Sequence, residues 1–186
     1  MKKLDAVNLI LDELGTRHVQ SLENTHPDVR TAVLQIDNEI ASLLTRGWWF
    51  NTIESVAVAP QANGFIILPE TVLVIETDNK YIVRRGQYLW DMSKNSRVFD
   101  TPVTMKQFVI LEWDALPHNA RQAVVHAAAA AVVRIKLSDM VRTNMLYNLA
   151  QSYAAALGDD EIRITQPNMY LPQRVAGIRA RLRRRV

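Results

Sequence analysis

The sequence predicts an α+β protein: a four-helix bundle that carries an inserted antiparallel β-sheet domain and ends in an extended basic C-terminal tail. Two stretches with helical spacing of apolar residues come first, and two more follow residue 113. Between them, short alternating runs separated by turn residues are typical of strands. The predicted divisions are 1–50 for the first two helices, 51–113 for the sheet, 114–158 for the last two helices and 159–186 for the tail.

The first two helices are predicted from apolar stripes and their boundary residues. Residues 2–14 form one stripe, and Gly15 supplies a helix stop. Pro27 suits the first turn of a second helix, which should run to about Arg46. The apolar positions of this second helix are Val29, Val33, Ile36, Ile40, Leu43 and Leu44.

The stretch "TRGWWFN", residues 45–51, joins the second helix to the first strand and uses two of the four tryptophans. We expect Gly47 to take the left-handed conformation that ends the helix, so that Trp48 folds back onto the last helical turn. Trp49 and Phe50 should begin the strand and point to opposite faces. We interpret these four residues as a helix stop and core plug. The alternative is a stacking platform for a ligand or for DNA.

The middle of the chain predicts an antiparallel meander of five or six strands. The strand-like runs are "FNTIESVAVAP", "GFIILP", "TVLVIETD", "KYIVRR", "QYLWD" and "VTMKQFVILEW". Asp78-Asn79 and Arg85-Gly86 are suited to hairpin turns between strands. The run "VLVIETD" is either an edge strand open to a partner strand or a covered strand.

Two further helices are predicted after the sheet. The third should run from about Pro117 to Leu137, and Ser138 or Asp139 could cap a fourth that ends near Leu157 at the following glycine. The third helix contains five consecutive alanines, which allow another helix to approach closely. This alanine run serves either packing inside the bundle or a contact between subunits. Residues 159–173 contain two prolines and should be extended or irregular.

The composition and motifs indicate no catalytic, cofactor-binding or metal-ligating residues. The chain has no cysteine, which excludes disulfides and thiolate metal sites and makes a reducing cytoplasm the simplest site of folding. No histidine stands three or four residues from another, and no nucleotide-binding glycine motif or G-x-S-x-G elbow occurs. We expect no membrane span and no signal peptide, because no apolar run is long and continuous enough. The histidines are His18, His26, His118 and His126.

The charge is distributed unevenly along the chain. Residues 174–186, "RVAGIRARLRRRV", contain six arginines and no acid. Removing them from 22 basic residues leaves 16 against 19 acidic residues, a net charge of −3 for the body. Such a tail binds phosphates without sequence preference, pairs with carboxylates of a protein partner, or is a solvated end. The apolar seam of Val175, Ile178 and Leu182 favours a protein partner.

Four motifs in the same order resemble the tail tubular protein A family, the adaptor or head-to-tail joining proteins of short-tailed bacteriophages. "RGWWFN" after "IDNEIASLL" is similar to the R-G-W-x-F-N junction of that family. "YIVRRGQYLWDMSKNSRVFD" is similar to its Y-x-x-R-G-x-Y-x-[YW]-D hairpin with an R-x-F-D ending. "AVNLILDELG", and "EWDALP" followed by a helix with Arg121, match in order and spacing. The resemblance covers about residues 4–155.

The resemblance implies a structural protein of the virion, assembled in the bacterial host cytoplasm. It implies a ring, twelve subunits in known cases, that joins the portal protein to the tail nozzle protein, surrounds the passing double-stranded DNA and helps retain the packaged genome. It also implies a helical bundle with a β-sheet domain. The competing hypothesis is a DNA-binding protein that uses the basic tail non-specifically.

The C-terminal segment of similar adaptors reaches the portal, although the last 28 residues here depart from the family pattern by being richer in arginine. Position and chemistry together therefore suggest a portal-docking segment. Its residues are Arg174, Val175, Ile178, Arg179, Arg181, Leu182, Arg183, Arg184 and Arg185.

Overall fold

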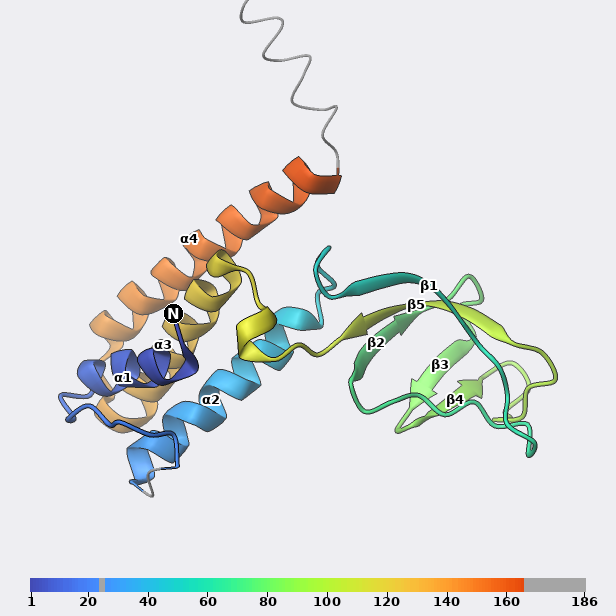
Figure 1. Cartoon of the computed structure of the whole chain (residues 1–186), viewed down its shortest axis with the longest axis horizontal. Coiled ribbons are helices and arrows are strands. Elements are labelled where there is room, and N and C mark those ends of the chain that lie inside the picture. The colour runs from blue at the N-terminus through green and yellow to red at the C-terminus, as the bar shows by residue number, and fades with distance from the viewer. Residues whose placement is uncertain (24–25, 166–186) are drawn as a thin grey trace, which may run out of the picture.

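The computed structural model describes residues 1–23 and 26–165 of the 186-residue chain. Helices gather at one end of the molecule and strands at the other, as Figure 1 shows. The chain passes from the helical part to the β part after residue 44 and returns after residue 109. The predicted α+β class is confirmed by this arrangement.

The helices begin and end where local sequence signals stand. The Asp5 carboxylate caps the first turn of α1 by accepting a 2.8 Å hydrogen bond from the Lys2 amide. Gly15, with φ of +69°, follows the end of α1, and Pro27 opens α2. The helices are α1 (Lys3–Glu13), α2 (Pro27–Leu44), α3 (His118–Leu137) and α4 (Met140–Thr165), with one 3₁₀ turn, η1 (Trp113–Ala115).

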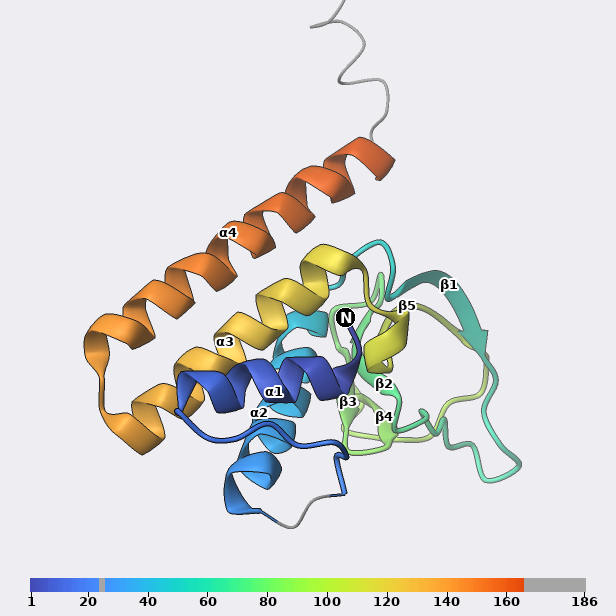
Figure 2. The ribbon, with the colours of Figure 1, turned by 60° about the vertical axis from the view of Figure 1, so that its left-hand side comes forward.

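Helix α3 is the centre of the helical part, because α1, α2 and α4 all pack against it. Its alanine run lies in this packing, since Ala128, Ala129 and Ala130 are buried in the main hydrophobic core. The main role of the run is therefore close packing within one chain. Helix α4 packs mainly on α3 and lies along the outside of the helical part, as Figure 2 shows.

The expected end of the fourth helix near Leu157 is wrong. Helix α4 continues through Gly158 to Thr165, so the acidic run that follows residue 158 is helical rather than extended. A glycine inside a helix costs about 1 kcal/mol relative to alanine, which local contacts can offset. Leu157 is fully buried against the core, and Asp160 accepts a 2.8 Å hydrogen bond from Asn119 at the start of α3.

The β part consists of two small antiparallel sheets. The strands are β1 (Thr52–Val58), β2 (Val72–Glu76), β3 (Ile82–Arg85), β4 (Tyr88–Asp91) and β5 (Val103–Val109). One sheet has the order β1-β5-β2, and the other is the β3-β4 hairpin. Phe108 of β5 pairs with Thr52 on one side and with Val74 on the other, which sets the register of the three-stranded sheet.

The predicted meander is wrong in its strand order. The last strand in sequence, β5, lies in the middle of its sheet, and both β1 and β2 are edge strands. The expected hairpin at Asp78-Asn79 does not form, because β2 pairs with β5 and not with β3. The run "GFIILP" forms no regular strand; it makes isolated bridges at Phe65 and Ile67. The hairpin at Arg85-Gly86 is present between β3 and β4.

A second, smaller core holds the two sheets together. Ile66, Leu68, Leu89 and Met105 are buried in it. Ile66 and Leu68 alternate with more exposed neighbours in the run that links the sheets, which explains why this run has the pattern of a strand. The apolar alternation therefore reports burial correctly, although the backbone of this run makes only isolated bridges, to the hairpin and to the segment at Val98 and Phe99.

None of the helices in residues 1–23 and 26–165 combines the length and the apolar character that crossing a bilayer requires. The predicted portal-docking residues, 174 to 185, lie outside the described residues.

Candidate functional site

The junction between the helical part and the β part is built around Gly47. This residue follows α2 with φ of +74°, a conformation that favours glycine. A Cβ atom on Gly47 would also overlap the ring of Phe108, which comes from β5. Two separate constraints, the backbone conformation and the close approach of an aromatic ring, therefore require glycine here.

Trp48 is buried in the main core, with 1% of its surface exposed. Its indole Nε1 donates a 2.9 Å hydrogen bond to the Leu43 carbonyl in the last turn of α2. The Arg46 guanidinium lies 4.9 Å from the ring centroid and covers the outer side of the indole. Because this ring is enclosed, it is not available as a stacking platform for a ligand or for DNA.

Trp49 and Phe50 do not begin the first strand, contrary to expectation. They lie in a turn closed by a 3.0 Å hydrogen bond from the Asn51 amide to the Trp48 carbonyl, and β1 starts only at Thr52. The Phe50 ring is parallel to Trp48 at 6.5 Å and meets Trp49 edge-on at 5.0 Å. Both side chains are half-buried and pack against the main core.

Asn51 is the junction residue to which sequence reasoning assigned no role. Its buried side chain accepts from the Trp48 amide at 2.8 Å and donates to the carbonyls of Leu44, at 2.9 Å, and Val109, at 3.0 Å. Its carbonyl also accepts from the Val109 amide at 2.9 Å. One amide thus connects the end of α2 to the end of β5. The signal in the sequence that could have indicated this role is the asparagine at the end of "RGWWFN".

The return connection is fixed at the N-terminal end of the chain. Trp113 of η1 is buried, and its Nε1 donates a 3.1 Å hydrogen bond to the Met1 carbonyl. The Arg121 guanidinium in α3 donates to the same carbonyl, also at 3.1 Å. The residues of "EWDALP" and the following arginine are therefore structural: they attach α1, η1 and α3 to one another.

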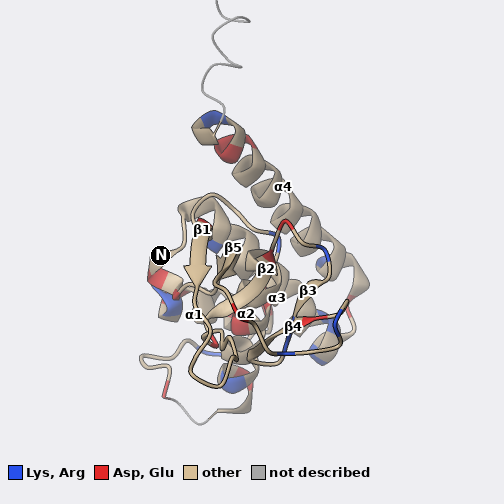
Figure 3. Ribbon diagram, turned by 90° about the vertical axis from the view of Figure 1, so that its right-hand side faces the viewer, with Lys and Arg blue, Asp and Glu red and all other residues tan. Residues whose placement is uncertain are grey.

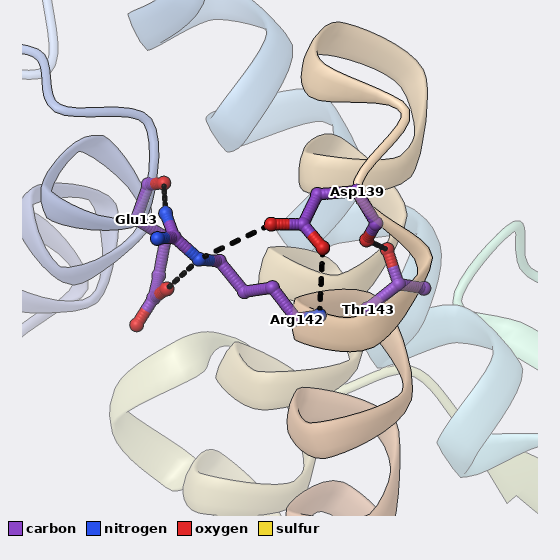
Figure 4. Close-up of polar contacts among 4 residues, drawn as sticks. All are labelled: Glu13, Asp139, Arg142 and Thr143. Carbon is purple, nitrogen blue, oxygen red and sulfur yellow. Dashed lines mark hydrogen bonds and ion pairs between the residues drawn. The ribbon is translucent and has the colours of Figure 1, made fainter.

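The corner between α3 and α4 carries a compact polar group, drawn in Figure 4. Asp139 caps α4, because its carboxylate accepts from the Arg142 amide at 3.0 Å. The Arg142 guanidinium donates to the Glu13 carbonyl at 2.8 Å and lies within 4 Å of the Glu13 and Asp139 carboxylates. Ser138, with φ of +54°, makes the reversal between the helices. This group holds the end of α1 against the start of α4.

The hairpin motif of residues 81–100 is also explained by local structure. Asp91 ends β4 and accepts hydrogen bonds from the Ser93 hydroxyl at 2.6 Å and from the Ser93 and Lys94 amides. The Ser93 hydroxyl is the main cause that lowers the pKa of Asp91. Arg97 stacks over Phe65 and Tyr88, at 4.1 and 5.3 Å from their centroids. Figure 3 shows basic residues on and beside β3 and β4.

His126 lies between α3 and α4, where its ring stacks on Tyr153 at a centroid distance of 5.6 Å. Burial lowers the pKa of His126, and the nearby Glu13 opposes that shift. In the described part of the chain, no group of three or more histidines and acidic residues is arranged to hold a metal ion. The geometry around His126 and at the junction therefore supports packing, and no arrangement for chemistry is built from these residues.

Two comparisons place the chain among known proteins. The family described as "Tube: Tail tubular protein" matches residues 4–166. Over 154 residues the chain is 34% identical to tail tubular protein A of Klebsiella phage KP34, which covers 81% of this chain and 80% of that protein. The resemblance carried by the four sequence motifs is thereby confirmed. The chain belongs to the tail tubular protein family and is a structural component of a bacteriophage virion rather than an enzyme.

Proposed function

We propose that this tail tubular protein is a subunit of an adaptor ring that joins the portal protein of the filled capsid to the tail nozzle. Twelve copies would surround a channel for the passing double-stranded DNA and help to retain the packaged genome. The observation that carries the proposal is the family match over residues 4–166, which includes the Asn51–Val109 connection between the helical and β parts.

The rigidity of the junction supports a load-transmitting role. The Asn51 amide and the Met1 carbonyl each connect segments that are far apart in sequence. A subunit that joins two other proteins must transmit force between its ends without separating its own parts. Polar groups that are buried and fully bonded restrict such separation, because opening them leaves unsatisfied groups.

The charge of the body is compatible with a DNA channel. Residues 1–173 carry 16 basic and 19 acidic residues once the six tail arginines are set aside. A strongly basic lumen would hold the phosphates of the duplex, because each neutralised phosphate adds to the binding free energy through counterion release. A mildly acidic body permits the DNA to slide.

The tail supplies the contact with the portal. Its arginines would pair with carboxylates of the portal protein, while Val175, Ile178 and Leu182 fill an apolar groove.

Electron microscopy of mixtures with purified portal complexes tests the proposal. Full-length protein should form rings on portals, whereas protein lacking residues 174–186 should not. Two matched variants separate charge from apolar contact: six arginines changed to glutamine, and Val175, Ile178 and Leu182 changed to serine. If full-length protein forms no rings on portals, the adaptor function is wrong. If the truncated protein binds equally well, only the docking role of the tail is wrong.

The six arginines also favour a second candidate, a non-specific DNA-binding protein. This function requires DNA affinity that needs no portal and falls steeply as salt rises. Fluorescence anisotropy with a labelled duplex at several salt concentrations, with and without residues 174–186, distinguishes it from the adaptor.

A further inference from the structure

The outward face of α4 carries no charge over most of its length. Residues 143–158 contain no Asp, Glu, Lys or Arg, although 22% of the whole chain is charged. Thr143, Leu146, Ala150 and Leu157 turn inward and are buried on this helix. The opposite face, which we name the α4 crest, consists of Val141, Asn144, Met145, Asn148, Ser152 and Ala155, all exposed.

This composition is unusual for a helix that faces water. The outward faces of α1 and α2 carry charged residues such as Asp12, Arg30 and Asp37, as surface helices normally do. On the α4 crest, Val141 is 73% and Met145 69% exposed. Depletion of charge together with an exposed Met is typical of the centre of a protein–protein interface. The absence of basic side chains argues against DNA as its partner.

A second uncharged surface lies on the β part. Residues 55–69 contain no charged residue, and β1 is an edge strand of its sheet. Open edges are normally protected by charged side chains, because their free backbone groups attract other chains. We name this surface the β1 edge; its exposed residues are Ser55, Ala57, Ala59, Gln61 and Ala62.

We propose that the α4 crest of one copy of this chain docks on the β1 edge of the next copy. The inference rests on the ring proposed above and names its subunit contact. A ring needs two different surfaces on each subunit, one for each neighbour. Figure 2 shows the first half of α4 and β1 on opposite sides of the molecule, as a head-to-tail contact requires.

Charge and length both match between the two surfaces. Placing the uncharged crest on the charged faces of α1 or α2 would strip water from those charges without providing partners, which is unfavourable. The named residues of the β1 edge carry no charge, and the one charged side chain of β1, Glu54, is already paired with Lys106 at 3.3 Å. The crest spans roughly 21 Å at 1.5 Å per residue, and residues 55–62, which contain the β1 edge, span roughly 26 Å when extended at 3.3 Å per residue. The small side chains of Ala57 and Ala59 allow close approach.

Site-directed cross-linking tests this contact, since the chain has no cysteine of its own. Rings are first formed on portals and verified by electron microscopy, and a short bis-maleimide is then added. Rings of the double variant Met145→Cys with Ala57→Cys should give a ladder of covalently linked subunits, from dimers upward. The subunits of each single variant should remain unlinked. The control pair Asn38→Cys with Ala57→Cys, which uses an exposed residue of α2, should give no ladder.

Charge insertion provides an independent measurement. Ser152→Glu and Ala57→Glu should each abolish rings while leaving the melting temperature within a few degrees of the parent, whereas Asn38→Glu should leave ring formation unchanged.

Verified rings without a ladder, or a ladder from Met145→Cys alone, would overturn the contact while the adaptor function stands. Absence of rings with the parent protein overturns both proposals.

Discussion

The ring of Phe108 occupies the space beside Gly47 in which any other residue would place its Cβ atom. The two residues come from the end of α2 and from the central strand β5, so their contact fixes the angle at which the helical part meets the β part. The neighbouring Asn51 amide bonds to the carbonyls on both sides of this contact. The junction is therefore a packed and hydrogen-bonded unit rather than a flexible hinge.

Gly47→Ala should destabilise the protein more than Gly15→Ala. Both glycines have positive φ, which costs roughly 1–2 kcal/mol for a residue with a Cβ atom. Only at Gly47 must the Phe108 ring also move, whereas nothing lies within 4 Å of a Cβ on Gly15. Urea unfolding followed by tryptophan fluorescence measures the difference. Equal losses in the two variants would contradict the steric role of Phe108.

Asn51→Asp should lower the free energy of unfolding by about 1–3 kcal/mol or more, the range for an unsatisfied buried group. The substitution replaces the Nδ2 donor by an acceptor that faces the carbonyls of Leu44 and Val109. Asn38→Asp on the exposed face of α2 is the matched control, with an expected change within roughly 0.5 kcal/mol. Thermal unfolding of both variants is the measurement. Indistinguishable transitions would show that the hydrogen bonds of Asn51 do not stabilise the junction.

Trp48→Ala should cost about 3–5 kcal/mol, the range for deleting a buried aromatic side chain. It also removes the hydrogen bond to the Leu43 carbonyl and the surface on which Arg46 stacks. Trp49→Ala, at a half-buried position, should cost less. Calorimetric melting temperatures rank the variants. Unchanged stability of Trp48→Ala combined with loss of portal binding would instead make Trp48 a recognition residue.

Acidification should weaken the fold through His126. Burial lowers the pKa of this residue in the folded state below its value of 6.5 in the unfolded chain. Between the two pKa values the unfolded state binds more protons, so stability is present above pH 6.5 and falls as the pH drops toward the folded-state pKa. His126→Phe, which retains a ring to stack on Tyr153, should flatten the dependence of melting temperature on pH between about 5 and 8. A variant with an unchanged slope would exclude His126 as the cause.

Local patterns were sufficient for most of the helices but not for the sheets. The start of α2 at Pro27 and the cap at Asp139 follow from residues within one turn, which is why the sequence predicted them. The end of α4 was missed because the signal of Gly158 is local, whereas the burial of Leu157 and the bond from Asn119 to Asp160 come from another helix. The strand order could not be predicted, because the residue pattern within one strand does not indicate its partner, and β5 pairs with both β1 and β2.

At the candidate site, a helix stop at Gly47 and a buried Trp48 could be predicted, because glycine and the apolar spacing before it act locally. The role of Asn51 could not, since its partner Val109 lies 58 residues away in sequence. The sequence by itself determined the α+β class, the basic tail and the family, all of which depend on composition, periodicity and motif order. Only the tertiary structure decided that β5 is central, that α4 continues to Thr165, and which uncharged residues face outward on α4 and β1. These features depend on which segments exclude water from one another, and that is settled by contacts between distant parts of the chain.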